Sequence, residues 1–206
     1  GKLFDKFGGL EYEGNWIDDK RHGIGGFYDH GKERYHGNWE NNKWNGEGIQ
    51  VFGEKIIYRG NFKDYNYDGQ GTKYYKNGNI NYEGNWKDDL YHGQGTFYYE
   101  NGNVCYEGQF RDNVQNGQGK CYYENGNIYE GKWFGGYKNG HGAFYFRNGK
   151  SYVGNFENDL VSGEGTYYNE NGGKKFVGEW KCNNLNGKGI EYDKDEKIKY
   201  EGEWKN

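Results

Sequence analysis

Histidine and cysteine are the residue types here that most often ligate metals or act as nucleophiles, and the sequence has five of the first and three of the second. His22 and His92 each precede a Gly-x-Gly tripeptide, at a position that the chain elsewhere fills with Asn, Asp or Ser. Such residues favour turns. Neither a Cys-x-x-Cys pair nor a recurring Cys–His pair is present. We therefore expect no metal site, no cofactor, no catalytic residue and no enzymatic activity.

Two further patterns point to ligands at first sight. Gly-x-Gly is typical of phosphate-binding loops, but those loops need a helix to follow, and here a strand-like segment follows eight times. The acidic pairs Asp18-Asp19 and Asp88-Asp89 lack the ligand spacing of a calcium loop. The net charge is −4 and no basic block occurs, so nucleic acid binding is not expected.

Composition limits the kind of structure that positions these residues. The chain has 39 Gly, no Pro, 23 Tyr, 12 Phe and 7 Trp, which disfavours helices and implies a core of aromatic rings. The odd number of widely spaced cysteines argues against a disulfide framework and favours a reducing compartment.

An aromatic-x-Gly-x-aromatic segment recurs nine times, at intervals of 23 or 24 residues, and Gly-x-Gly follows the first eight. We expect one continuous array over 1–206, with 1–11 as part of a preceding unit, eight full units starting at 12, 35, 58, 82, 106, 129, 152 and 176, and a partial ninth over 200–206.

Each unit is predicted to be a β-hairpin. Tyr82 to Trp86 alternate with period 2, a loop of about six residues covers 87–92, and a second strand begins at Gly93. Two-residue type I′ turns such as Asn77-Gly78 would join successive units and take up the 23-versus-24 variation. With Trp86 opposite Gly93, Gly84 would pair with Gly95, and a stripe of glycines would run from Gly14 to Gly202.

The leading tyrosines and the Trp/Phe residues four positions later would flank this glycine stripe on the same face. We call the predicted feature the aromatic trough and expect it to bind a partner, because contiguous exposed aromatic surface usually marks an interface. Its predicted groove residues are Trp39, Phe62, Trp86, Phe97, Phe110, Trp133, Phe144, Phe156, Tyr58, Tyr82, Tyr106 and Tyr129. Positions that vary between units, and so are expected to set specificity, include Trp44, Tyr67, Tyr91, Tyr137 and Leu160.

The unit resembles the membrane occupation and recognition nexus (MORN) repeat, which runs approximately Y-x-G-x-W, loop, H/N-G-x-G. Tyr82-Glu83-Gly84-Asn85-Trp86 followed by His92-Gly93-Gln94-Gly95 carries the resemblance. It implies an all-β fold: an elongated, open-ended, single-layer antiparallel sheet of tandem β-hairpins. It also implies an intracellular scaffold, cytoplasmic or associated with the cytoskeleton, a cilium or a membrane, with dimerisation through terminal repeats as one mode of assembly.

From these observations we expect a non-catalytic scaffold that binds a peptide, a helix or a second copy of the chain along the aromatic trough. A peripheral phospholipid-binding module is an alternative, which the net charge of −4 disfavours. A carbohydrate-binding repeat is a second alternative, because bacterial cell-wall-binding repeats are also short aromatic hairpins.

Overall fold

The computed structural model describes residues 1–205; Asn206, the last residue of the predicted ninth unit, lies outside the described residues. The described chain is all-β, and its eighteen strands belong to one open antiparallel sheet, as expected. The strands are β1 (Lys2–Phe4), β2 (Leu10–Ile17), β3 (Lys20–Asp29), β4 (Lys32–Glu40), β5 (Lys43–Phe52), β6 (Lys55–Lys63), β7 (Asn66–Tyr74), β8 (Ile80–Lys87), β9 (Leu90–Tyr98), β10 (Val104–Arg111), β11 (Val114–Tyr122), β12 (Ile128–Phe134), β13 (Tyr137–Tyr145), β14 (Ser151–Glu157), β15 (Leu160–Tyr168), β16 (Lys174–Lys181), β17 (Asn184–Tyr192) and β18 (Ile198–Trp204).

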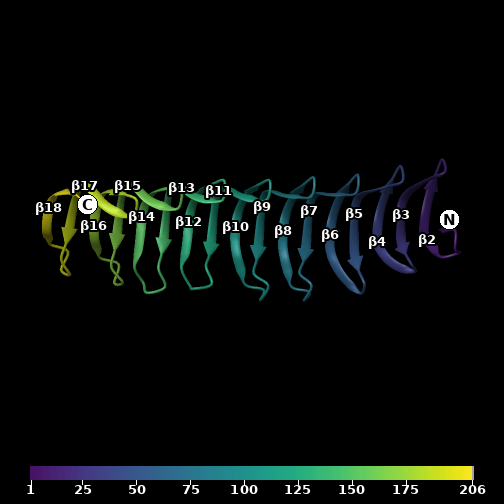
Figure 1. Ribbon diagram of the computed structural model, residues 1–206, viewed down its shortest axis with the longest axis horizontal. Coiled ribbons are helices and arrows are strands. Elements are labelled where there is room, and N and C mark those ends of the chain that lie inside the picture. Colours follow the sequence, from purple (N-terminus) through teal and green to yellow (C-terminus); the bar gives the residue numbers. More distant parts are fainter. Residues whose placement is uncertain (206) are drawn as a thin grey trace. The chain divides into compact units, whose positions relative to one another are not determined.

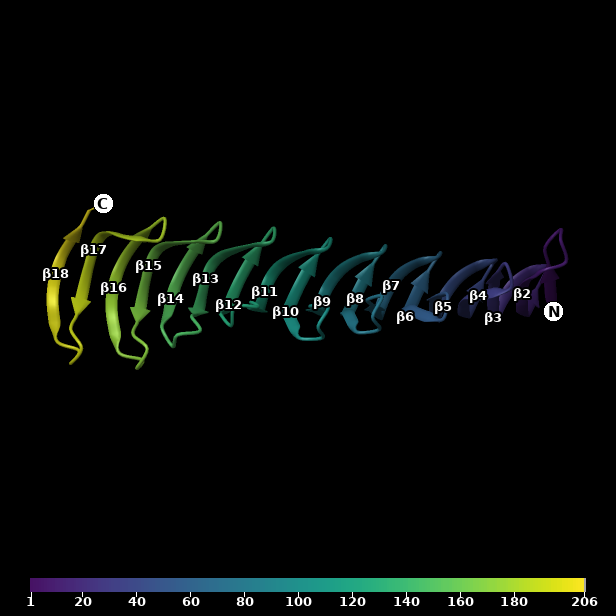
Figure 2. The same ribbon diagram turned by 60° about the horizontal axis from the view of Figure 1, so that its bottom comes forward.

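The chain forms two compact units. The first contains Gly1–Val104 and Arg111–Asn113, and the second contains Cys105–Phe110 and the described residues from Val114 onward. Within each unit the hairpins follow one another in chain order, as Figure 1 shows. The strands are also bowed along their length (Figure 2). Because successive side chains along a strand point to opposite faces, each strand has one face with the aromatic rings and an opposite face without them.

The hairpin loop within each repeat is much shorter than the predicted six residues. In the fourth repeat β8 runs to Lys87 and β9 begins at Leu90, so the connection consists of Asp88 and Asp89 alone. Their φ angles are 47° and 65°, the positive values that a type I′ turn needs at both central residues. Short polar side chains tolerate this conformation, which explains the Asp and Asn pairs at these points of the sequence.

The Asn-Gly connections between repeats are, conversely, longer than the predicted two-residue turns. Tyr75 N–H donates to the Asn79 carbonyl at 2.8 Å, and Gly78 N–H donates to the Tyr75 carbonyl at 3.0 Å. Of Asn77 and Gly78 only the glycine has a positive φ, 92°. This is a three-residue connection closed by a glycine bulge, so the type I′ assignment of Asn77-Gly78 was wrong.

The 23-versus-24 variation is shared between turns and strands, which corrects the prediction in part. The first repeat combines the two-residue turn His30-Gly31 with a bulge between Phe27 and Tyr28. The fifth, also 23 residues long, has a longer turn at Asn125-Gly126 and no bulge between β11 and β12. The third repeat, of 24 residues, has both the longer turn and a bulge after Lys73. A bulge absorbs one residue without inverting the rest of the strand.

The predicted glycine pairing is confirmed in both units. In the first, cross-strand pairs run from Gly14–Gly25 to Gly84–Gly95. In the second they run from Gly119–Gly131 to Gly189–Gly202. Trp86, however, lies opposite Tyr91 rather than Gly93, because the register shifts between Gly84 and Trp86. The short Asp-Asp turn forces this shift, since it starts the second strand three residues earlier than predicted.

Candidate functional site

The leading tyrosines are the centre of the core in each unit. Tyr12, Tyr35, Tyr58 and Tyr82 in the first unit, and Tyr106 and Tyr129 in the second, have no exposed surface. Each of these hydroxyls donates to the backbone carbonyl three residues further on; for Tyr58 the acceptor is Asn61, at 3.0 Å. The ring consequently folds back over the glycines of its own hairpin. Burial raises the pKa of the Tyr58 and Tyr82 hydroxyls above the ordinary tyrosine value.

The Trp and Phe residues of the motif pack edge-on against these tyrosines. Phe62 contacts Tyr58 of its own repeat, with ring centroids 5.0 Å apart, and Tyr35 of the preceding repeat, at 5.2 Å. Tryptophan adds a hydrogen bond to the preceding repeat: Trp86 Nε1 donates to the Gly71 carbonyl at 3.0 Å. Successive hairpins are thus joined by rings as well as by the backbone.

The aromatic trough is therefore filled, and this corrects the predicted open groove. Ten of its twelve predicted residues are buried, namely Trp39, Phe62, Trp86, Phe110, Trp133, Phe156, Tyr58, Tyr82, Tyr106 and Tyr129. Phe97 and Phe144 are half-buried and lie across from Tyr82 and Tyr129. Where a tyrosine leads the motif, its ring occupies the space above the paired glycines, as at Gly71 and Gly95, and closes the glycine floor there.

The predicted specificity positions divide into two groups. Trp44, Tyr67 and Tyr91 stack on Tyr35, Tyr58 and Tyr82, with centroid separations of 4.3, 3.7 and 4.0 Å. They cover the core tyrosines, and burial raises the pKa of Tyr67 and of Tyr91 to about 12. Tyr137 and Leu160 instead lie beside the turns of the second unit, where both are exposed.

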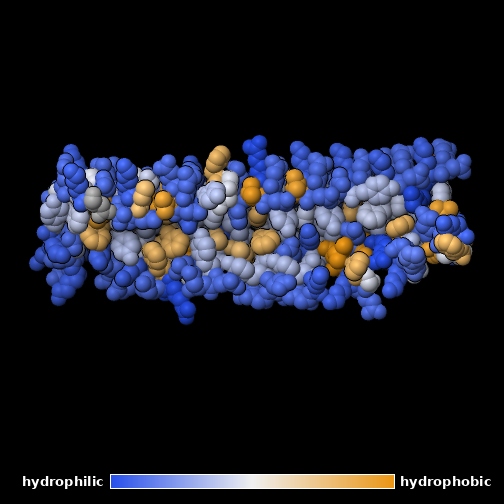
Figure 3. Space-filling model, viewed as in Figure 1, coloured by the Kyte–Doolittle hydropathy of each residue, from blue (hydrophilic) through white to orange (hydrophobic). Residues whose placement is uncertain are grey.

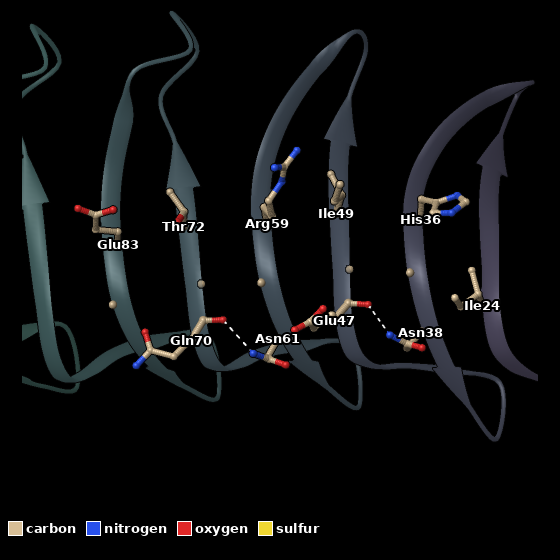
Figure 4. Close-up of a pocket in the computed structure, with 15 residues that line it drawn as sticks. Ile24, His36, Asn38, Glu47, Ile49, Arg59, Asn61, Gln70, Thr72 and Glu83 are labelled. Atoms are coloured by element: carbon tan, nitrogen blue, oxygen red, sulfur yellow. Dashed lines mark hydrogen bonds between the residues drawn. The ribbon is translucent and has the colours of Figure 1, made fainter.

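The opposite face of the sheet holds a groove in the first unit, with a volume of about 920 Å³. Side chains at the intervening positions of the motifs line it, because neighbours along a strand point to opposite faces. Figure 4 shows two rows across the strands: His36, Ile49, Arg59, Thr72 and Glu83 in one, and Asn38, Glu47, Asn61 and Gln70 in the other, with Ile24 at one end. We call this the groove face.

Amide side chains hold the second row in place. Asn38 Nδ2 donates to the Glu47 carbonyl at 3.1 Å, and Asn61 Nδ2 donates to the Gln70 carbonyl at 3.3 Å (Figure 4). Both bonds span the point where the glycine of the second strand, for example Gly69, takes a positive φ of 95°. The Asn of the motif therefore stabilises the bulge and one wall of the groove at the same time.

The second unit has smaller hollows, lined by side chains at the equivalent positions of its own repeats. One of about 450 Å³ is lined by Gln118, Glu130, Lys132 and His141, and another of about 420 Å³ by Val177, Lys188, Ile190 and Glu203. In Figure 3, which shows one face of the molecule, blue hydrophilic residues border paler and orange ones. The residues that line the hollows differ between repeats, whereas the ring positions are aromatic in every repeat.

The sequence reasoning missed the groove-face residues, including His36, Arg59, Glu83, Ile49 and Thr72. They occupy the variable positions within the motifs themselves, alternating with the glycines and rings. Their period-2 spacing from Tyr and Gly already placed them together on the face opposite the rings. The composition already indicated a core of aromatic rings, but the alternation pattern does not show whether those rings leave the aromatic face open.

Comparison with protein families identifies the repeat. The model of the MORN repeat matches residues 12–29, 35–54, 58–80, 82–104, 106–128, 129–151, 152–174, 176–196 and 200–206. None of the curated proteins compared with the chain matches it. MORN repeats are generally non-catalytic and suggest a protein- or membrane-interaction module. The described residues contain no helix of the length and apolarity that crossing a membrane requires.

Proposed function

The chain belongs to the MORN repeat family, and we propose that it is a non-catalytic scaffold that binds a segment of a partner protein on its groove face. The observation that carries the proposal is the contrast between the two faces of the first unit. The aromatic face is sealed by stacked rings, whereas the opposite face has a groove of about 920 Å³ lined by side chains that differ from repeat to repeat.

The proposed binding surface is the groove face, in place of the aromatic trough expected from the sequence. Residues such as Trp86 and Tyr58 retain a structural role, since their burial leaves little of either ring for a partner to contact. Repeat scaffolds generally keep the fold in constant positions and the partner preference in variable ones. Here several variable positions with accessible side chains, such as Arg59 and Glu47, line the groove.

A protein partner fits the groove better than an anionic lipid surface does. The groove of the first unit contains both signs of charge, with Arg59 beside Glu47 and Glu83. The whole chain has a net charge of −4. Membrane attraction depends on clusters of Lys and Arg, at about 1 kcal/mol for each residue near the surface. We place the complex in a cytoskeletal, ciliary or membrane-associated assembly, the setting that the family suggests.

Site-specific photocrosslinking in the intact protein tests the proposal. A photoreactive phenylalanine at Thr72 faces the groove, and the same residue at Lys73 faces the rings. The Lys73 position is a matched control that tolerates an aromatic side chain, because Phe97 and Phe144 occupy the equivalent position in other repeats. We expect a discrete protein adduct from position 72 and none from position 73.

Other adducts would decide against the proposal. A lipid adduct at position 72 would favour the membrane alternative, and an adduct of twice the chain's mass would identify a second copy as the occupant. Equal crosslinking from both positions would remove the distinction between the faces on which the proposal depends.

A further inference from the structure

One position of the groove face differs in charge from its counterparts in the other repeats. The residue between the leading aromatic residue and the glycine of each motif lies on the groove face, and five of the nine are glutamate. In repeat order they are Glu13, His36, Arg59, Glu83, Glu107, Glu130, Val153, Val177 and Glu201. Arg59 is the one guanidinium in the series, so the groove reverses its charge there.

The other ionisable side chains in the same row already have partners. His36 Nδ1 lies 3.1 Å from Glu33 Oε1, and Glu83 accepts a hydrogen bond from the Tyr98 hydroxyl. Within residues 1–205 the Arg59 side chain is exposed and makes no ion pair and no side-chain hydrogen bond. Figure 4 shows Arg59 extending away from the row that contains Glu47, so its guanidinium is left for an outside acceptor.

The neighbours of Arg59 define what that acceptor can be. Across the strands Arg59 pairs with Thr72 on β7 and with Ile49 on β5. Thr72 provides a hydroxyl, while Ile49, together with Ile24 two strands further on, provides aliphatic surface in the same groove. A guanidinium binds a planar carboxylate through two parallel hydrogen bonds. A more highly charged anion is disfavoured because Glu47 and Glu83 line the same groove.

We propose that the groove of the first unit selects a protein segment with an acidic side chain beside an aliphatic one, the carboxylate seated on Arg59 and Thr72 and the aliphatic group on Ile49. The inference rests on the proposed function, since it names the chemistry of the partner that the groove binds. Charge complementarity at a single position gives specificity in this arrangement, and the aliphatic contact removes apolar surface from water.

Selection from a displayed random-peptide library on the immobilised full chain tests the inference. We expect the wild-type protein to enrich peptides that combine Asp or Glu with Ile, Leu or Val. Arg59→Glu creates the residue type found at this position in five other repeats, so the fold should tolerate it. This variant should bind the selected acidic peptides roughly tenfold more weakly or worse and should enrich Lys or Arg instead. Arg147→Glu, the same charge reversal at an exposed residue that does not line the groove, is the matched control and should keep the acidic preference.

The outcomes separate the inference from the proposed function. Thr72→Trp places a large side chain in the groove and should block it. If the selected peptides lose binding in this variant but show no preference for acidic residues, the inference is overturned and the proposed function stands. Acidic peptides whose affinity is unchanged by Arg59→Glu would also overturn the inference. A selection in which no peptide depends on Thr72, while every variant keeps the circular dichroism spectrum of the wild type, would overturn both.

Discussion

The Tyr58 hydroxyl occupies the position that a Cβ on Gly71 would take, although the two residues lie on neighbouring strands, β6 and β7. The same relationship joins Tyr35 to Gly48 and Tyr82 to Gly95. Glycine is therefore required at position 71 because there is no space for a side chain. The backbone conformation does not require it, since Gly71 has no positive φ. The tyrosine core and the glycine stripe are two halves of one packing arrangement.

Gly71→Ala should destabilise the first unit. The added methyl group overlaps the Tyr58 ring and forces it off its hydrogen bond, an overpacking that costs about 1–3 kcal/mol. Urea unfolding followed by tryptophan fluorescence measures the loss. Gly173→Ala is the control, because its φ is not positive and its nearest neighbours are the flexible ends of Glu196 and Asn171. Equal losses in both variants would contradict the steric explanation.

Tyr58→Phe isolates the hydrogen bond from the ring. It keeps the stacking on Tyr67 and removes the 3.0 Å bond to the Asn61 carbonyl, so a loss of about 1 kcal/mol is expected in the free energy of unfolding. Tyr200→Phe removes the equivalent bond to Glu203 at an exposed position and should cost less. A larger effect at Tyr200 would show that burial does not set the strength of this bond.

Trp86 should be sensitive to loss of its ring and tolerant of exchange for phenylalanine. Trp86→Ala removes a buried ring and should cost about 3–5 kcal/mol. Trp86→Phe loses the bond to the Gly71 carbonyl and should cost about 1 kcal/mol, since Phe62 and Phe110 occupy the same position in adjacent repeats. Urea unfolding followed by circular dichroism compares the two variants. If Trp86→Ala and Trp86→Phe lowered the free energy of unfolding by similar amounts, ring packing would not be the main stabilising interaction of Trp86.

Asp89 should link the third and fourth repeats through its turn. Its Oδ1 accepts from Tyr67 N–H at 2.8 Å, and its own N–H donates to the Tyr67 carbonyl at 3.0 Å. Asp89→Gly keeps the positive φ but removes the side-chain acceptor, so hydrogen exchange at the Tyr67 amide should accelerate. Asp89→Asn keeps an acceptor, as Asn113 does for Tyr91, and should leave that exchange nearly unchanged. If the Tyr67 amide remained protected from hydrogen exchange in Asp89→Gly, the Asp89 side chain would not link the two repeats.

Alkaline pH should unfold the protein cooperatively. Burial raises the pKa of Tyr67, Tyr91 and Tyr152 to about 12, above the value of about 10 for an unfolded tyrosine. The native state therefore holds more protons than the unfolded state between pH ~10 and 12, and stability falls as pH rises through this window. Tyrosinate absorbance and the β-sheet dichroism should change together. Titration of these tyrosines at pH ~10 without unfolding would contradict their burial.

Much of the fold could be predicted from the sequence because each assignment recurs in several repeats and can be checked against all of them. Period-2 alternation around Tyr82, Gly84 and Trp86 placed these residues on one face, and the glycine pairing followed from hairpin geometry. Turn types were not accessible in the same way. Asp88-Asp89 and Asn77-Gly78 both suit positive φ, and which of them makes the two-residue turn depends on where bulges shorten or lengthen the strands.

The sequence by itself determined the repeat, the all-β hairpin fold and the residues that share a face. Only the tertiary structure decided which face is open. The Tyr58 ring could lie beside Gly71 and leave the glycine exposed, or it could fold over Gly71 as a lid and cover it. The alternation pattern is the same in both cases. The bond from its hydroxyl to the Asn61 carbonyl selects the lid, because a buried tyrosine must satisfy that hydroxyl. That bond closes the aromatic face, so the open groove lies at Arg59 and its neighbours.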